Sequence, residues 1–437
     1  MPGWDISTAG KGNRAAAALM RGLGHVANAS RRPTVLFLTQ FFPPETFAGA
    51  NRAHALAGAL AETHALTVVA LYPGYPNQNC FEAEAVAGFD SMVPFSIRRR
   101  FRFSPHRHRS ALGRAAREQW VAFVLALRGL GVRADVVVTS SPTMFLGPVG
   151  LVAARMKRAA FVWDVRDITW AMTGEMTGGN RFLRLLASAL CSAMWATARR
   201  CDLLVAATPG IARMALEAGV AADRIVTVEN GITEPLRVAL AGSRSRSQRA
   251  RPVVSYVGLL GKAQELSTLV EAAQRLPDVD FVIAGDGPQR SRLQQQVRRS
   301  GCDNVRLVGY VRPAQLPGLF GDSDLLFAQV ADSSTLNRTA RPSKLLEYMA
   351  AGRPIVYAGG GDAATLVTEV GCGVCTAPGD PEGIAATIRQ LLDDDQRRGE
   401  LGRRGATYVD GLPSRDERMR GLARIVQQRF STSGRPR

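Results

Sequence analysis

Short apolar runs recur along the first half of the chain, separated by turn residues and helix-like stretches. The runs are Val35–Leu38, Leu66–Leu71, Asp135–Val138, Ala160–Asp164 and Leu203–Ala206. Apolar runs of this length are typical of strands that are buried on both faces. Their alternation with helices predicts a right-handed parallel sheet with helices on both sides.

The same pattern starts again after a polar and basic stretch at residues 243–251. The second series of runs is Val253–Val257, Phe281–Ala284, Val305–Val308, Leu325–Ala328 and Ile355–Ala358. The sequence therefore predicts two doubly wound, Rossmann-like α/β domains. Folds of this type bind ligands beyond the carboxyl ends of their strands, so we expect the site in a central cleft that both domains face.

Charge and cysteine content narrow the class of protein. The 437 residues include 55 Lys and Arg against 37 Asp and Glu, a net charge of +18 that favours anionic partners. Six cysteines in so long a chain do not indicate a disulfide framework, so we expect a reducing, cytoplasmic compartment. Neither the five histidines nor the pair Cys372 and Cys375 has partners at metal-ligand spacing, so we predict no metal site.

A basic segment precedes an apolar run at residues 98–127. Residues 98–117 hold eight arginines and no acid, and Trp120–Leu127 is apolar. This juxtaposition predicts peripheral contact with an anionic membrane surface; the alternative is a solvated basic face beside a core helix. Aromatic residues are not interleaved with the basic ones, which disfavours nucleic acid as a partner. No window of 18 consecutive apolar residues occurs, so we expect no membrane span.

Two glycine-rich turns follow strands in the second half, Gly258–Gln264 and Gly285–Pro288. Glycine lets the backbone approach an anion closely. In the first turn, a helix that begins near Gly261 can supply free N–H groups, and Lys262 adds a positive charge. The alternative for both is an ordinary turn between a strand and a helix, with Lys262 as a surface lysine.

Two further motifs lie downstream of these turns. The stretch Arg341–Ile355 predicts a helix that ends at Gly352, before a strand. Its Glu347 can accept two hydrogen bonds from vicinal sugar hydroxyls; the alternative is an exposed glutamate in a salt bridge. The last motif, Gly359–Asp362, is predicted to be a phosphate- or sugar-facing loop or a plain turn.

In their order and spacing these motifs resemble the donor domain of glycosyltransferase family 4, the retaining GT-B enzymes. Pro342–Ile355 and the sequence Gly-Lys-Ala-Gln at 261–264 resemble a subgroup that glycosylates polyprenyl-linked intermediates or builds surface polysaccharides. The first half agrees with the family in its opening loop (Thr39–Glu45, Gly49, Arg52), its central strand end (Trp163–Asp167) and its hinge (Glu229–Ile232). The resemblance covers about residues 33–410.

The resemblance implies roles for the matching residues. The donor-binding set is Gly49, Gly261, Lys262, Tyr310, Val311, Arg312, Lys344 and Glu347. Within it, Glu347 binds the ribose, Lys262 and the backbone near Gly261 hold the diphosphate, and residues 310–312 dock the base. The catalytic pair is Asp167 and Arg166, which face the reacting sugar or the acceptor.

The predicted organisation has five segments. They are a loosely ordered basic extension (1–32), an acceptor-side Rossmann-like domain (33–240), a basic linker (241–251), a nucleotide-sugar donor domain (252–405) and a helical segment returning to the first domain (406–437).

The implied reaction is transfer, with retention, of a sugar from a UDP- or GDP-sugar to a glycan or polyprenyl-phosphate-linked acceptor in envelope polysaccharide synthesis. No cofactor beyond this co-substrate is implied. Metal is unnecessary because N–H groups and Lys262 can offset the charge of the leaving diphosphate. The acidic triplet Asp322–Asp324 is predicted to be a turn before a strand rather than a metal motif, and a front-face route needs no enzyme nucleophile.

Two departures from the family pattern keep alternatives open. The family often has a glutamate eight residues before the ribose-binding one, where this chain has Thr339, and Ile168–Trp170 replaces the usual Leu-Trp-Pro. The alternatives are a GT-B nucleotide-sugar epimerase and a catalytically degenerate GT-B protein that acts as a binding partner. A dinucleotide-dependent dehydrogenase is disfavoured because no G-x-G-x-x-G follows the first strand of either domain.

Overall fold

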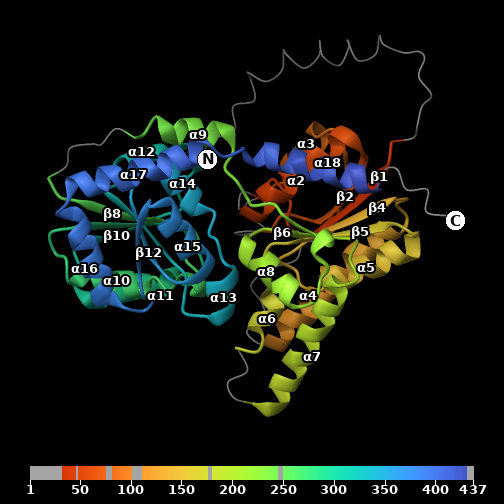
Figure 1. Ribbon diagram of the computed structural model, residues 1–437, viewed down its shortest axis with the longest axis horizontal. Coiled ribbons are helices and arrows are strands. Elements are labelled where there is room, and N and C mark those ends of the chain that lie inside the picture. The colour runs from red at the N-terminus through yellow and green to blue at the C-terminus, as the bar shows by residue number, and fades with distance from the viewer. Residues whose placement is uncertain are drawn as a thin grey trace, which may run out of the picture. The chain divides into compact units, whose positions relative to one another are not determined.

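The computed structural model describes residues 32–45, 48–74, 81–100, 111–175, 180–244 and 250–430. Residues 33–437 belong to one compact unit. Its described part contains two parallel sheets, one of seven and one of six strands (Figure 1). Each sheet with its covering helices is called a lobe below. The extension predicted for residues 1–32 lies, except for its last residue, outside the described residues.

The first sheet has the strand order β3-β2-β1-β4-β5-β6-β7, and all its pairings are parallel. Its strands are β1 (Thr34–Thr39), β2 (Ala65–Leu71), β3 (Ser96–Arg100), β4 (Val136–Ser140), β5 (Ala160–Val165), β6 (Leu203–Ala206) and β7 (Ile225–Thr227). The five predicted strands are confirmed, and the two that were not predicted, β3 and β7, form the two edges.

The second sheet has the order β10-β9-β8-β11-β12-β13 and is also parallel throughout. Its strands are β8 (Val253–Val257), β9 (Asp280–Ala284), β10 (Val305–Gly309), β11 (Leu325–Gln329), β12 (Ile355–Ala358) and β13 (Gly373–Thr376). The order turns back at β8 in this sheet, as it does at β1 in the first. Two such sheets are the predicted pair of doubly wound α/β folds.

Helices cover both faces of each sheet. In the first lobe they are α2 (Ala48–Thr63), α3 (Ala83–Met92), α4 (Ala111–Leu130), α5 (Leu146–Lys157), α6 (Thr169–Met172), α7 (Arg181–Ala198), α8 (Pro209–Glu217) and, leading out of it, α9 (Glu234–Ala241). The remainder are α10 (Ser267–Gln274), α11 (Arg290–Ser300), α12 (Leu316–Gly321), α13 (Ser334–Thr339), α14 (Lys344–Ala350), α15 (Gly361–Val370), α16 (Pro381–Leu392), α17 (Asp395–Asp410) and α18 (Arg415–Phe430). Short 3-10 helices lie at Ala222–Arg224, Lys262–Gln264 and Pro313–Gln315.

Alternate residues of β1 belong to two different cores. Leu36 and Leu38 pack with residues of α4, α5, α7 and α8. Val35 and Phe37 pack on the opposite face with residues of α2 and α18. This two-residue alternation, with both faces apolar, is the reason that a continuous apolar run forms a central parallel strand.

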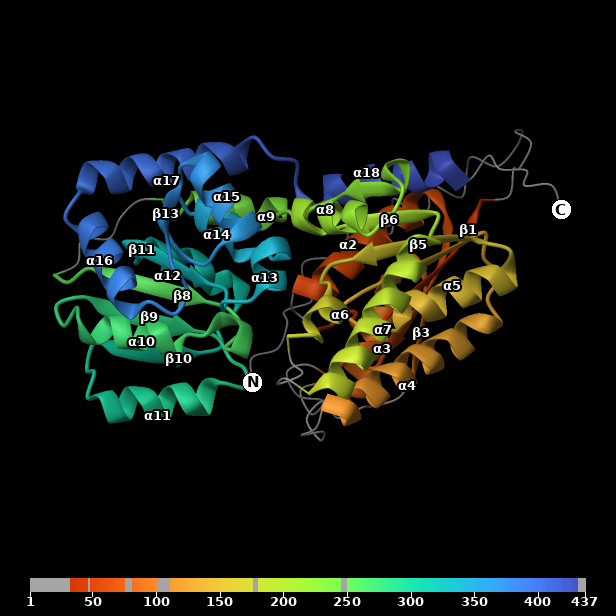
Figure 2. The ribbon, with the colours of Figure 1, turned by 60° about the horizontal axis from the view of Figure 1, so that its bottom comes forward.

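The last described helix, α18, packs on the first lobe, although the chain reaches it from the second. Its Met419, Leu422 and Val426 lie in the same apolar core as Phe37 of β1. Both ribbon views place α18 beside α2 (Figures 1 and 2). The preceding helix α17 packs against α14 of the second lobe. The chain therefore crosses between the lobes twice within the described residues, once near α9 and once between α17 and α18.

Candidate functional site

Three turns meet at the carboxyl edge of the second sheet, after β8, β9 and β10. The Leu260 N–H donates to the Asp286 carbonyl at 2.9 Å, and the Gly285 N–H donates to the Gly309 carbonyl at 2.7 Å. Gly285 has a φ of +141°, and a Cβ atom on it would lie 1.8 Å from the Gly258 carbonyl oxygen. Only glycine fits such a position, so the glycine-rich turns hold each other in place by direct backbone packing.

The first of these turns differs from the prediction in one respect. The predicted start of the helix near Gly261 is wrong. Residues Lys262–Gln264 form a single 3-10 turn, and α10 begins only at Ser267. The Gly261 N–H donates to the Gln264 Oε1 at 3.2 Å, which caps that turn locally. The Lys262 side chain is exposed. Both Gly261 and Lys262 line a hollow of about 300 Å³ that Gln289, Arg292 and Gln296 border from α11 and the residue before it.

Lys344 lies at the first position of α14 and points at β8. Its Nζ donates to the Tyr256 hydroxyl at 2.7 Å and lies 3.8 Å from the centroid of the same ring. A Cβ atom on Gly258 would lie 2.7 Å from this Nζ, so the ammonium group touches the first glycine turn. Burial lowers the pKa of Lys344 to about 7, against the opposing effect of the Glu347 carboxylate.

Glu347 lies one turn further along α14. It is half-buried rather than exposed, and no described cation lies within ion-pair distance of its carboxylate, which argues against a surface salt bridge. Burial raises its pKa, while the charges of Arg415 and Lys344 act in the opposite direction. Lys344 and Glu347 are thus both affected by burial, and each influences the charge of the other.

The direction of α14 is determined by the residue next to Glu347. The Tyr348 hydroxyl accepts from the Val257 N–H at 3.0 Å and donates to the Phe327 carbonyl at 3.2 Å. These bonds attach α14 to the end of β8 and the middle of β11, and Tyr348 is fully buried. Arg415, from α18, donates to the Asn230 and Gly231 carbonyls at 3.3 Å each. The Glu347 environment is therefore completed by a residue beyond the predicted donor domain.

The residues predicted to dock the base follow β10. Tyr310 is 58% exposed, Val311 is partly buried and Arg312 is exposed. The Arg312 backbone N–H donates to the Gln315 Oε1 at 3.1 Å, which caps the 3-10 turn that follows. These residues lie at the same sheet edge as the Gly258 and Gly285 turns, since β10 pairs with β9 and β9 with β8.

Arg166 and Asp167 follow β5 at the carboxyl edge of the first sheet. The Ser141 hydroxyl accepts from the Arg166 N–H at 2.7 Å, and the Arg166 guanidinium donates to the Ser141 carbonyl at 3.1 Å. Burial lowers the pKa of Arg166, opposed first by the Asp167 carboxylate beside it. The Asp167 side chain is exposed. The arrangement holds the Arg166 side chain in place and leaves the Asp167 carboxylate open.

A buried ion pair lies directly behind these two residues. The Arg52 guanidinium donates to Asp164 at 2.7 Å, and both side chains are fully buried. Asp164 also accepts from the Ser140 hydroxyl at 2.8 Å, and Arg52 donates to the Asn230 Oδ1 at 3.2 Å. Gly49, buried in the first turn of α2, precedes Arg52 by three residues. Arg52 and Asp164 belong to separate sequence motifs, and nothing in their spacing predicts that they form a pair.

Asp362 and Glu229 carry contacts between the lobes. Asp362 is almost fully buried and accepts from the Gly210 N–H at 3.3 Å, Arg213 at 3.2 Å and Arg341 at 3.4 Å. Arg341 also pairs with Glu229. One prediction for Gly359–Asp362 was a flexible loop that faces a sugar or phosphate, and this is wrong for Asp362. The residue lies in the first turn of α15, and its carboxylate accepts hydrogen bonds from these donors.

Thr339, at the position where the family often has a glutamate, closes the end of α13. Its hydroxyl donates to the Thr335 carbonyl at 2.7 Å, and its own carbonyl accepts from the Thr208 hydroxyl at 2.8 Å. The side chain is buried. Thr339 is therefore part of the contact between α13 and α8.

Asp324, from the acidic triplet, also has a structural role. Its carboxylate accepts a hydrogen bond from the Val253 N–H at 2.7 Å and so joins the start of β11 to the start of β8.

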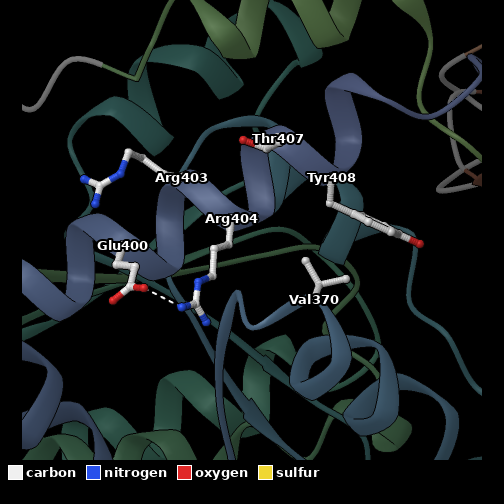
Figure 3. Close-up of a pocket in the computed structure, with 6 residues that line it drawn as sticks. All are labelled: Val370, Glu400, Arg403, Arg404, Thr407 and Tyr408. Carbon is white, nitrogen blue, oxygen red and sulfur yellow. Dashed lines mark hydrogen bonds and ion pairs between the residues drawn. The ribbon is translucent and has the colours of Figure 1, made fainter.

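A larger hollow, of about 610 Å³, lies on α17 (Figure 3). Val370, Glu400, Arg403, Arg404, Thr407 and Tyr408 line it. Arg404 is paired with Glu400, one turn earlier on the same helix. None of the residues predicted from the sequence contributes to this hollow.

Across the described residues, no group of three or more His, Cys, Asp or Glu side chains could hold a metal ion. The same part of the chain contains no helix that is both long and apolar enough to cross a bilayer. The basic segment at 98–117 is described only in part, because residues 101–110 lie outside the described ranges.

Two bacterial relatives align with parts of this chain. It is 26% identical over 258 residues to the 2-deoxystreptamine glucosyltransferase of Streptomyces kanamyceticus, covering 56% of this chain and 64% of the relative. It is 27% identical over 278 residues to the putative colanic acid biosynthesis glycosyl transferase WcaI of Escherichia coli, covering 59% and 66%. These alignments take in slightly less than two thirds of each relative's own length.

Solved structures agree with the fold over nearly the whole chain. Anabaena Alr3699/HepE in complex with UDP-glucose is 18% identical, with a TM-score of 0.66 and coverage of 90% of this chain and 99% of the other. WaaG, a glycosyltransferase involved in lipopolysaccharide biosynthesis, is 15% identical, with a TM-score of 0.63 and coverage of 91% and 100%. At these identities the likeness shows the GT-B fold.

Two family profiles match the two lobes in order. The profile described as Glycosyl transferase 4-like domain matches residues 47–231, and the profile described as Glycosyl transferases group 1 matches residues 243–408. Together they take in most of the chain; the first spans β2 to β7 and the second spans β8 to β13. The chain therefore belongs to the group 1, family 4 glycosyltransferases of the GT-B fold.

Proposed function

We propose that this protein transfers a sugar from a UDP- or GDP-sugar to a glycan or polyprenyl-phosphate-linked acceptor, with retention of configuration and without a metal ion. The observation that carries the proposal is the grouping of Lys344 and Glu347 on α14, directly beside the glycine turn at Gly258. A cation beside a glycine turn, where the backbone can approach an anion closely, suits a diphosphate, and a half-buried carboxylate suits vicinal hydroxyls.

The donor would lie along the carboxyl edge of the second sheet. Glu347 would accept hydrogen bonds from the ribose hydroxyls, and the exposed residues 310–312 would contact the base. Lys262 and the backbone near Gly261, rather than a helix terminus, would bind the diphosphate from one side. Lys344 would face it from the other. HepE, which shares this fold, has been solved with UDP-glucose, and this supports a sugar nucleotide as the donor.

The chemistry requires charge relief on the leaving diphosphate. Lys344, held against Tyr256 in a partly dry site where a charge acts more strongly than in water, and the exposed Lys262 would supply it. In a front-face route the leaving phosphate oxygen takes the proton of the acceptor hydroxyl as the new glycosidic bond forms, so no enzyme nucleophile is needed. Asp167 would orient the acceptor, Arg166 would support it, and Gly49 would let the α2 turn approach the donor phosphates.

The acceptor class rests on relatives and charge. Lipopolysaccharide core glycosyltransferase LpsE of Rhizobium meliloti, WcaI and WaaG are named for envelope polysaccharides. A net charge of +18 favours an anionic partner, and a polyprenyl-phosphate-linked acceptor is one such partner. We accordingly propose a cytoplasmic enzyme that works at the inner face of the membrane.

The test is a binding screen followed by turnover. The thermal midpoint of the protein is measured with UDP, GDP and their sugars, and the best donor is then incubated with and without glycan and polyprenyl-phosphate acceptors, in the presence of EDTA. Stabilisation by one nucleotide and acceptor-dependent release of it support the proposal. Rapid release of the nucleotide without acceptor points instead to an epimerase. Binding without turnover across the acceptors points to a degenerate binding protein.

A further inference from the structure

One face of the first lobe exposes many large apolar side chains to solvent. Helices α4, α5 and α7 cover the same side of the first sheet, and α5 contacts both of the others. Their outward-facing large apolar residues are Trp120, Phe123, Leu127, Leu130, Val152, Met156, Phe182, Leu183, Leu185 and Leu186. We call this set the apolar face.

On α4 these residues form one straight stripe. Trp120, Phe123, Leu127 and Leu130 follow each other at spacings of three and four, so they lie on one side of the helix. The rings of Trp120 and Phe123 lie 6.0 Å apart and are both about half exposed. The opposite side of α4 is buried in the core of the lobe. The helix is thus apolar on two sides, and only one of them has a partner among the described residues.

The amino-terminal half of α7 extends beyond the core. Phe182 and Leu185 are 68% and 70% exposed, and their neighbours Leu183 and Leu186 are about half exposed. The carboxyl-terminal half of the same helix is anchored, because Met194 is buried in the core. Figure 1 shows the amino end of α7 pointing away from the sheet. The first two turns of α7 therefore form a projecting apolar element on a firmly held base.

The charged residues of the three helices are predominantly basic. Helices α4, α5 and α7 together contain one acidic residue, Glu118, whereas their basic residues are Arg114, Arg117, Arg128, Arg155, Lys157, Arg181 and Arg184. Of these, Arg128, Arg155, Arg181 and Arg184 are exposed. Arg181 and Arg184 lie one turn apart at the amino end of α7, on the side away from Leu183 and Leu186.

We propose that the apolar face docks on an anionic lipid bilayer, with Phe182, Leu185 and Leu186 of α7 inserted among the headgroups and the α4 stripe alongside. An apolar projection with a basic surround fits a surface that is negative outside and apolar below. A second copy of the chain fits poorly, because it would bring two basic surrounds together. The inference does not depend on the identity of the donor or acceptor, since this face contains none of the proposed donor-binding or catalytic residues.

The test uses the full chain and vesicles. Flotation with phosphatidylcholine vesicles is compared with flotation on vesicles containing about one third phosphatidylglycerol. The protein should float only with the anionic vesicles, and less so at high salt. The double variant Leu185→Ser/Leu186→Ser should lower vesicle affinity at least tenfold. Arg181→Gln/Arg184→Gln should weaken the preference for anionic lipid.

Matched controls keep the test independent of folding and of catalysis. Val238→Ser on α9 and Leu216→Ser on α8 remove exposed apolar side chains elsewhere and should float like the parent protein. The α7 variant should keep the parent's thermal midpoint and its stabilisation by nucleotide. Equal flotation of the parent and the α7 variant would overturn the proposal. So would absence of anionic-vesicle binding, or an α7 variant whose sole change is loss of self-association.

Discussion

The Lys344 ammonium nitrogen lies 2.7 Å from the Tyr256 hydroxyl and 3.8 Å from the centre of the Tyr256 ring. The contact joins the start of α14 to β8, next to the glycine turn at Gly258. Because burial lowers the pKa of Lys344 to about 7, its charge is only partly present at neutral pH. A bound diphosphate would favour the charged form, so this lysine is suited to respond to the donor.

The first prediction concerns stability against pH. Lys344 titrates near 7 in the folded protein and near 10.5 when unperturbed, so between these values the unfolded chain binds the extra proton. The contribution of Lys344 to the free energy of unfolding therefore rises as the pH increases above 7. The rise is roughly 0.5–1 kcal/mol per pH unit after allowance for partial exposure of the side chain. Urea denaturation at pH 7, 8 and 9 should show this rise in the parent and lose it in Lys344→Met. The exposed-lysine control Lys262→Met should follow the parent, and parallel profiles for all three proteins would contradict the assignment.

Glu347→Ala tests the proposed ribose contact. Loss of hydrogen bonds to a charged group should weaken nucleotide-sugar binding by about 1.5–3 kcal/mol, which is roughly 10- to 150-fold in dissociation constant. Titration calorimetry with the preferred donor measures it. Glu369→Ala, an exposed glutamate on α15, is the matched control and should bind like the parent. An unchanged affinity in Glu347→Ala would remove Glu347 from the site.

Asp164→Asn tests the buried pair with Arg52. Removing one charge leaves the Arg52 guanidinium buried without its counter-ion, which should cost about 3–5 kcal/mol of unfolding free energy. The control is Asp278→Asn, whose partner Arg389 and own side chain are both well exposed, and its cost should stay below about 1 kcal/mol. Denaturant titration compares them. Similar losses of unfolding free energy in the two variants would show that the buried pair of Arg52 and Asp164 contributes no more to stability than the exposed pair.

Gly285→Ala tests the packing of the glycine turns. The new Cβ would lie 1.8 Å from the Gly258 carbonyl oxygen, at a φ of +141°, so the β8 and β9 turns must separate. We expect a loss of at least about 2 kcal/mol in stability, together with loss of nucleotide binding. Gly318→Ala on α12 meets nothing within 4 Å and should be neutral or slightly stabilising. A Gly285→Ala protein that binds donor normally would show that the turn does not need its present geometry.

Much of the fold follows from local patterns. Each predicted apolar run became a strand with ends shifted by at most two residues, because a parallel strand buried on both faces needs a continuous apolar sequence. The predicted helix ending at Gly352 is also confirmed, with α14 closing just before it. The edge strand β3, with the sequence Ser-Ile-Arg-Arg-Arg, was missed because its three successive arginines leave no apolar run. The three-residue β7 is too short to leave a pattern.

Other features needed the three-dimensional arrangement. The helix expected at Gly261 does not start there because the Gln264 side chain caps a separate turn, and no propensity distinguishes these two outcomes. Arg52 and Asp164 are 112 residues apart in the chain, and Arg415 reaches the surroundings of Glu347 from the last described helix. Sequence spacing cannot show such partners. Packing of α2 against the first sheet brings Arg52 to Asp164, and the crossing between α17 and α18 brings Arg415 to Glu347.

The sequence by itself determined the two parallel sheets and the positions of their glycine turns, because strand periodicity and turn chemistry are local properties of the chain. The candidate donor residues came from the resemblance of its motifs to family 4 glycosyltransferases. Only the tertiary structure decided which of those residues are buried, which cation adjoins which carboxylate, and that α7 leaves its apolar amino end exposed. Burial and charge pairing depend on segments distant in sequence, and these quantities determine the pKa of Lys344 and the environment of Glu347.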